Sequence, residues 1–264
     1  MDWIEVNGIT LRYDLSGSGK EVLVLVHEMG GTLELWDDVL PQLSEGRRVL
    51  RFDMRGAGLS EKPVQPLDLD VMVDDIATLL DALAITAPVA IAGCAIGGAM
   101  AMHFAAKYQD RTAALIAMGP AIGVVGDRRT ATLARADTVE RSGLRSIEEA
   151  LFTATYPRRL QAADPQRFRR FRARFFANHP SSYAAINRLL ANMEMERDLE
   201  AIRCPTLVLA GTMDALRPPD QIEPLALKVS NAEFRALETG HFMPLQTPDL
   251  VAREMTNFLA RAGV

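Results

Sequence analysis

At residues 91–98 the sequence reads Ile-Ala-Gly-Cys-Ala-Ile-Gly-Gly. The apolar run before it, residues 89–92, is typical of a buried strand, whereas the residues from Gly97 onward have the spacing of a helix. In a strand-to-helix turn of the form Gly-x-nucleophile-x-Gly, the central residue is strained, and bulky side chains at the two flanking positions collide with neighbouring backbone. Gly93 and Gly97 fit these flanking positions, so residue 95 is the nucleophile position, and Ala95 occupies it.

Ala95 has no oxygen or sulfur with which to attack a carbonyl carbon. Cys94 is one residue early, and its side chain should leave the turn in another direction. We therefore favour a serine-to-alanine change made to hold a substrate intact. The alternatives are a natural ligand-binding protein without catalysis, and an altered mechanism or a cysteine nucleophile replaced by alanine.

Two further positions follow apolar runs that read as strands. Asp214 comes shortly after the run 206–210, and His241 comes shortly after the run 233–237. A loop histidine is suited to act as a general base, and an acid is suited to orient it. The chain order is nucleophile position, acid and base, which is the order in α/β-hydrolases. The strand ending at Met118 is followed by Gly-Pro, so the alternative position for the acid holds no carboxylate.

A loop of sequence His-Glu-Met-Gly-Gly, residues 27–31, directly follows the apolar run 22–26. We expect the backbone amide of Met29 in this loop to form an oxyanion hole with the amide of Ile96. Glu28 stands where glycine is usual, and a carboxylate beside an oxyanion hole opposes the build-up of negative charge there. Glu28 therefore either bonds a neighbouring loop or contacts substrate or water.

Short apolar runs alternate with amphipathic segments through the first 121 residues and again after residue 199. This alternation predicts an α/β protein with a mostly parallel central sheet flanked by helices. Residues 122–198 contain helical patterns but no convincing strand. We expect residues 1–121 and 199–264 to form the core, and residues 122–198 to form a helical lid inserted after the sixth strand, over the sheet edge where such folds bind ligands.

The predicted lid is rich in arginine, with twelve arginines against six acidic residues between positions 126 and 175. These arginines form either a solvated helical face or, for one or two of them, a grip on a substrate carboxylate through bidentate hydrogen bonds. The lid also carries the phenylalanines Phe168, Phe171, Phe175 and Phe176. They form either the core of the lid or the contact face of a homodimer.

The composition is ordinary for a globular protein of 264 residues, with 48% hydrophobic residues and a net charge of −5. The charge argues against nucleic acid and anionic membranes as partners. No leader with a basic start and an apolar centre is visible, and no apolar run reaches the roughly 18–20 residues of a membrane helix. Cys94 and Cys204 lack the spacing of metal ligands. We expect a cytoplasmic protein without a metal or cofactor.

The sequence resembles the α/β-hydrolase superfamily over essentially its whole length. Within that superfamily it is most similar to 3-oxoadipate enol-lactonases and related small lidded serine hydrolases. The resemblance is carried by the strand-to-helix turn at residues 93–97, by Asp214 and His241, by residues 49–60 (Val-Leu-Arg-Phe-Asp-Met-Arg-Gly-Ala-Gly-Leu-Ser) and by residues 199–211. The Asp-x-Arg-Gly-x-Gly-x-Ser part is common to many hydrolases and specifies little.

The resemblance implies that Ala95 occupies the serine position, with Asp214 as the acid and His241 as the base. It also implies that Met29 and Ile96 donate to the oxyanion. The implied activity is hydrolysis of a small, anionic, carboxylate-bearing lactone, ester or amide, and the chain with Ala95 should lack it. The alternatives are a carbon–carbon bond hydrolase of the ring-cleavage type and a non-catalytic ligand-binding homologue.

Overall fold

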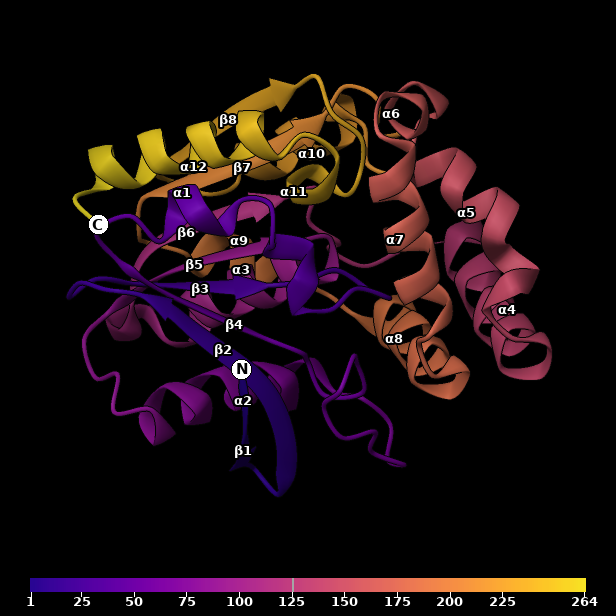
Figure 1. Cartoon of the computed structure of the whole chain (residues 1–264), viewed down its shortest axis with the longest axis horizontal. Coiled ribbons are helices and arrows are strands. Elements are labelled where there is room, and N and C mark those ends of the chain that lie inside the picture. The colour runs from indigo at the N-terminus through magenta and orange to yellow at the C-terminus, as the bar shows by residue number, and fades with distance from the viewer. Residues whose placement is uncertain (125) are drawn as a thin grey trace.

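The computed structural model describes residues 1–124 and 126–264, which form a central sheet with helices around it (Figure 1). The sheet has eight strands in the order β1-β2-β4-β3-β5-β6-β7-β8. Their bounds are β1 Asp2–Val6, β2 Ile9–Gly17, β3 Val22–Val26, β4 Arg48–Phe52, β5 Val89–Cys94, β6 Thr112–Met118, β7 Thr206–Gly211 and β8 Ala232–Leu237. β2 runs antiparallel to β1 and β4, and all the other pairs are parallel. The prediction of a mostly parallel sheet is confirmed.

The central strands are buried along their whole length. β3, β5 and β7 have no exposed residue, as their continuous apolar sequences predict for strands covered on both faces. In the parallel register of β3 and β5, Val26 lies opposite Gly93. The loop after β3 and the turn after β5 therefore leave the same edge of the sheet side by side.

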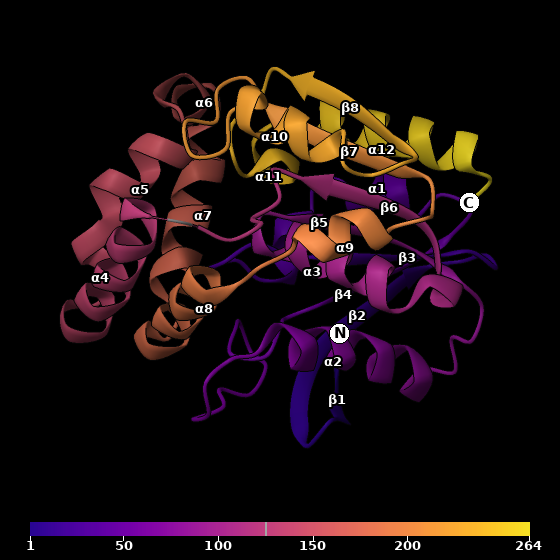
Figure 2. The ribbon, with the colours of Figure 1, turned by 180° about the vertical axis from the view of Figure 1, so that it is seen from behind.

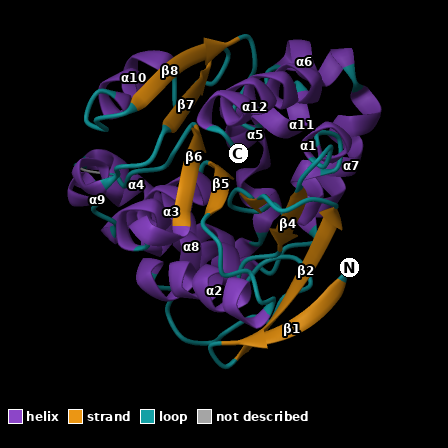
Figure 3. Ribbon diagram, turned by 90° about the vertical axis from the view of Figure 1, so that its left-hand side faces the viewer, coloured by secondary structure: helices purple, strands orange, loops and turns teal. Residues whose placement is uncertain are grey.

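Helices cover both faces of the sheet (Figure 3). One face carries α2 (Leu69–Ala82), α3 (Ile96–Lys107), α9 (Glu196–Ala201) and α10 (Pro219–Ala226), and the other carries α1 (Leu40–Leu43), α11 (Met243–Gln246) and α12 (Pro248–Ala262). Short 3-10 helices, η1 (Leu33–Trp36) and η2 (Gln109–Arg111), lie between these elements. The apolar core divides accordingly into two clusters, one on each side of the sheet.

In the described residues, six α-helices lie between β6 and β7 in the chain, and the five before α9 lie next to the carboxyl edge of the parallel strands (Figures 1 and 2). They are α4 (Asp127–Ser142), α5 (Glu148–Thr155), α6 (Arg158–Ala163), α7 (Pro165–Phe176) and α8 (Pro180–Asn192), with the 3-10 helix η3 (Leu144–Ile147) before α5. The expected boundary after residue 198 falls inside α9, which packs against α3 of the core. Each helix in the described residues is too short or too polar to span a bilayer.

An aromatic cluster joins these helices to the core. Phe171 and Phe175 of α7 are buried, and both pack around Phe152 of α5. The ring of Phe171 lies 4.8 Å from that of Phe242, which is in the loop after β8. Phe168 is partly buried and contacts Phe152. Burial of these rings within one chain fits the interpretation that they form a core.

Candidate active site

The turn after β5 has the strained geometry that its glycines predict. Ala95 has φ 53° and ψ −113°, a conformation that side-chain-bearing residues rarely adopt. A Cβ atom on Gly93 would overlap the carbonyl of Gly97, and one on Gly97 would overlap the carbonyl of Val26. The two glycines therefore let α3 start directly against β5 and β3, with residue 95 at the tip of the turn.

His241 and Asp214 meet in the structure although 27 residues separate them in the chain. The Nδ1 atom of His241 lies 2.7 Å from Oδ2 of Asp214, and both side chains are buried. The other carboxylate oxygen, Oδ1, accepts hydrogen bonds from the backbone amides of Leu216 and Arg217 at 2.8 and 3.0 Å. Asp214 is thus fixed by its own turn and in turn orients the imidazole, which leaves Nε2 of His241 directed away from the carboxylate.

The loop after β3 is held by His27. Its Nδ1 donates to the carbonyl of Glu28 at 2.7 Å, and its Nε2 accepts from the amide of Met54 at 3.0 Å. Burial lowers the pKa of His27, which keeps this ring neutral. Met29 and Ile96 both line the cavity beside Ala95. Ile96 is the first residue of α3, so its amide has no intrahelical acceptor.

Cys94 is directed away from this cavity. Its buried Sγ donates to the backbone carbonyl of His241 at 3.4 Å. Burial raises the pKa of the thiol well above its usual range, so a nucleophilic thiolate is disfavoured. The expectation that the Cys94 side chain leaves the turn in another direction agrees with this geometry.

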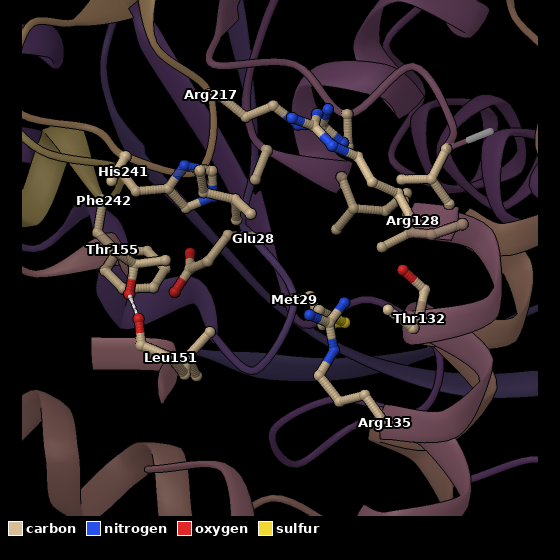
Figure 4. Close-up of a pocket in the computed structure, with 18 of the residues that line it drawn as sticks. Glu28, Met29, Arg128, Thr132, Arg135, Leu151, Thr155, Arg217, His241 and Phe242 are labelled. Atoms are coloured by element: carbon tan, nitrogen blue, oxygen red, sulfur yellow. Dashed lines mark hydrogen bonds between the residues drawn. The ribbon is translucent and has the colours of Figure 1, made fainter. Parts of the chain in front are cut away.

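Ala95, His241, Met29 and Ile96 share one cavity of about 280 Å³ (Figure 4). The helices between β6 and β7 supply part of its lining. Their lining residues include Arg128, Thr132 and Arg135 of α4, Leu151 and Thr155 of α5, and Tyr183 of α8. The volume suits a small molecule rather than a polymer. Four of the positions predicted from the sequence to act together therefore line one cavity, and Asp214 contacts it through His241.

Glu28 projects into the same cavity, beside His241 (Figure 4). Its side chain is buried, and its Oε2 atom has no hydrogen-bond partner in the described residues. Burial raises the pKa of Glu28 to about 7, against the opposing effects of a hydrogen bond with its own backbone and of the charge of Arg174. The sequence left open whether this side chain bonds a neighbouring loop or contacts substrate or water, and in the structure it lines the cavity.

The other end of the cavity is cationic. The guanidinium groups of Arg128 and Arg217 lie close together there, and Arg135 is nearby (Figure 4). In the described part of the chain, none of these three arginines has a carboxylate within ion-pair distance, although Arg128 donates to Gln221 and Arg135 donates to Asn187. Burial and then the charge of Arg128 lower the pKa of Arg217. An anion placed here would be attracted by more than one guanidinium.

Sequence reasoning missed Arg217, because it lies in the turn after β7 and outside the arginine-rich segment. The only signal was its position three residues after Asp214. Several arginines of the arginine-rich segment are occupied elsewhere: Arg167 pairs with Asp38, Arg172 with Glu148, and Arg159 with Glu238. In residues 1–124 and 126–264, no group of His, Cys, Asp and Glu side chains is arranged to hold a metal ion.

Known proteins share this architecture. Residues 21–248 match the family model described as alpha/beta hydrolase fold. The chain is 32% identical to the dihydrolipoyllysine-residue acetyltransferase component of the acetoin cleaving system of Pseudomonas putida, over 97% of this chain and 68% of that one. It is 24% identical to 3-oxoadipate enol-lactonase 2 of Acinetobacter baylyi, over 94% of this chain and 92% of that one.

A solved structure is similar over its full length. It is the malate-bound form of a thermophilic esterase from Thermogutta terrifontis, which has a TM-score of 0.93 and 26% identity over 100% of both chains. The family match covers most of the chain, and the sheet order, the turn at Ala95 and the Asp214–His241 pair agree with it. The chain therefore belongs to the α/β-hydrolase fold family.

Proposed function

We propose that this protein has the site of a hydrolase for small acyl compounds that carry a free carboxylate: a lactone, an ester or an amide. The observation that carries the proposal is the convergence of Ala95, His241 and the Met29 loop on one cavity whose far end holds Arg128 and Arg217. One end of this cavity is suited to acyl transfer and the other to an anion.

The proposed mechanism needs a hydroxyl at position 95. A serine there would attack the acyl carbon while its proton passes to Nε2 of His241, and Asp214 would stabilise the resulting imidazolium. The amides of Met29 and Ile96 would hold the oxyanion. Water activated by His241 would then release the acyl group. With Ala95 this covalent route is closed, and its rate should fall by about 10⁶ while binding is retained.

The substrate class follows from charge at the far end of the cavity. Arg128 and Arg217 lack carboxylate partners among the described residues, so a substrate carboxylate would accept hydrogen bonds from their guanidinium groups. Two similar proteins have names that fit this class, since one is an enol-lactonase and the other is an esterase solved with bound malate. We assign the carboxylate grip to Arg217 and Arg128, with Arg135 in support.

The helices α4–α8 act in this proposal as a lid, and the remainder as the core. Backbone carbonyls at the end of α5 tie the lid to both loops of the acid–base pair: Ala154 accepts from Ala215, and Thr155 accepts from His241, at 3.2 and 3.1 Å. A lid fixed in this way would exclude water while the substrate is bound.

The proposal is tested by the variant Ala95→Ser with a panel of esters, lactones and amides, each with and without a free carboxylate. We expect hydrolysis by the variant, faster for the compounds that carry the carboxylate. A vinylogous diketone in the same panel tests for carbon–carbon cleavage. A folded variant that hydrolyses no acyl compound of the panel contradicts the proposal, whereas binding without turnover by both proteins would favour a ligand-binding role.

A further inference from the structure

We propose that Glu28 is a catalytic acid–base group, with which the chain carrying Ala95 hydrolyses its acyl substrate by direct attack of water and without a covalent intermediate. The inference rests on the proposed function for the nature of the substrate. It concerns a different route, which needs no serine.

The position of Glu28 carries the inference. In the described residues it supplies the only carboxylate that lines the cavity, because Asp214 is covered by His241 and its own turn. The next residue, Met29, belongs to the proposed oxyanion hole. A Cβ on Gly31 would overlap the Glu28 carboxylate, so the glycine leaves room for that side chain. A group at this place lies beside the scissile bond of any acyl compound held at the oxyanion hole.

A structural role does not account for Glu28. A buried carboxyl group that stabilises a fold is normally paired or fully hydrogen-bonded, because an unpartnered buried polar group costs about 1–3 kcal/mol. The Glu28 carboxyl has a hydrogen bond with its own backbone, but its Oε2 has no partner in the described residues, and the hydroxyl of Tyr183, from α8 in the same cavity, also lacks one. Two unpartnered polar groups that line one cavity point to a ligand that supplies their partners.

The burial of Glu28 leaves it able to exchange a proton near neutral pH. His241 from the loop after β8 and Tyr183 of α8 line the cavity with Glu28, while Cys94 at the end of β5 and Arg174 of α7 interact with it electrostatically from outside the cavity. Burial raises the pKa of Glu28 to about 7. Both its protonated and its ionised forms are therefore populated at the pH at which a proton donor is most effective.

Ala95 gives water access to the acid–base pair. Nδ1 of His241 is engaged by Asp214, so Nε2 is the nitrogen available at the cavity. A serine hydroxyl would occupy the space between Nε2 and the substrate, whereas the methyl group of Ala95 leaves room for a water molecule. Water in that place is positioned to attack an acyl carbon held at the amides of Met29 and Ile96.

The proposed steps balance. As the water oxygen bonds to the acyl carbon, Nε2 of His241 takes a proton from water and the carbonyl electron pair moves onto oxygen. When the carbonyl re-forms, the bond from the acyl carbon to the leaving oxygen breaks, and that oxygen takes the proton of protonated Glu28. The proton on His241 then returns to the Glu28 carboxylate. The net reaction is ester and water to acid and alcohol.

The test compares the unaltered chain with Glu28→Gln on two esters of adipic acid. Methyl hydrogen adipate has a poor leaving group that needs a proton, and 4-nitrophenyl hydrogen adipate has a good one that does not. We expect Glu28→Gln to lower the rate of hydrolysis of the methyl ester about 100-fold or more, and that of the nitrophenyl ester less than about 10-fold. The methyl-ester rate should also fall as the pH rises above 7. Glu45→Gln, at an exposed glutamate outside the cavity, should change neither rate.

Equal slowing of the hydrolysis of both esters in Glu28→Gln contradicts an acid role for Glu28. Hydrolysis by the unaltered chain that is no faster than hydrolysis in buffer alone contradicts it too. Incorporation of ¹⁸O from labelled water into the Glu28 carboxylate during turnover would show attack by Glu28 itself and would also overturn the proposal. If Glu28→Gln does not fold, Glu28→Asp can be used instead, because its shorter side chain moves the carboxyl away from the substrate. It should show the same dependence on the leaving group. Activity of Ala95→Ser on both esters together with an inert unaltered chain removes this inference and leaves the proposed function intact.

Discussion

The backbone amide of Arg217 lies 3.0 Å from Oδ1 of Asp214. The same turn after β7 therefore fixes the carboxylate that orients His241 and carries an arginine to the opposite end of the cavity. The acid–base group and the proposed anion grip are thus held at a set separation by one short segment. A substrate must then have its carboxylate and its scissile bond at a matching distance.

The turn at residue 95 can be tested through stability. We expect Gly97→Ala to lower the free energy of unfolding by about 3 kcal/mol or more, because its Cβ would meet the carbonyls of Val26 and His27 rather than flexible side-chain ends. Gly46→Ala serves as a comparison, since no atom lies near a Cβ there and only the positive φ opposes it. Urea denaturation of the two variants measures the difference. Equal losses would show that crowding at the turn is unimportant.

The proposed anion grip predicts a preference among ligands. The unaltered chain should bind a carboxylate-bearing ester more tightly than its methylated form by about 1.5–3 kcal/mol, the range for hydrogen bonds to charged groups. Arg217→Gln and Arg128→Gln should each reduce that preference, while Arg141→Gln, at an exposed arginine of α4, should leave it unchanged. Titration calorimetry with both ligands measures the preference. Equal affinity of the unaltered chain for acid and methyl ester removes the grip.

Glu28 should make the stability of the protein depend on pH. Because burial raises its folded pKa to about 7 from 4.5, the folded state binds more protons than the unfolded state between these values. The contribution of Glu28 to the free energy of unfolding is therefore fully present below pH 4.5 and is lost as the pH rises to about 7. The loss is on the order of 3 kcal/mol. Glu28→Gln should lack this loss, and Glu45→Gln should keep it. Unfolding curves that are parallel for all three proteins across this range would contradict the assignment.

The Asp214–His241 pair predicts a kinetic effect in the background of Ala95→Ser. Adding Asp214→Asn should lower kcat by about 10⁴, because an amide can no longer hold the imidazole in the tautomer that accepts a proton at Nε2. Asp220→Asn, at an exposed acid at the start of α10, is the matched control and should leave kcat near its starting value. Steady-state kinetics on one ester decides the matter. A small effect of Asp214→Asn would assign the acid role to another residue.

Much of the fold could be predicted from local sequence. The continuous apolar run Val22–Val26 is typical of the buried strand that it forms, and the turn glycines identify position 95. The position of the proposed carboxylate grip could not be predicted, because it depends on which side chains the helices α4–α8 and the turn after β7 bring together. Arg217 has no neighbouring pattern, and the partners of Arg167 and Arg172 are set by tertiary packing. The expected boundary after residue 198 falls inside α9, and the packing of α9 on α3 is likewise set by tertiary contacts.

The central claim is that the turn at Ala95 and the Asp214–His241 pair form a serine-type site from which only the nucleophilic atom is missing. The most direct test treats the unaltered chain and Ala95→Ser with a fluorophosphonate that labels activated serines, and maps the adduct by peptide mass spectrometry. We expect one adduct, at position 95 of the variant, and none in the unaltered chain. A folded Ala95→Ser protein that stays unlabelled at position 95 would contradict the claim.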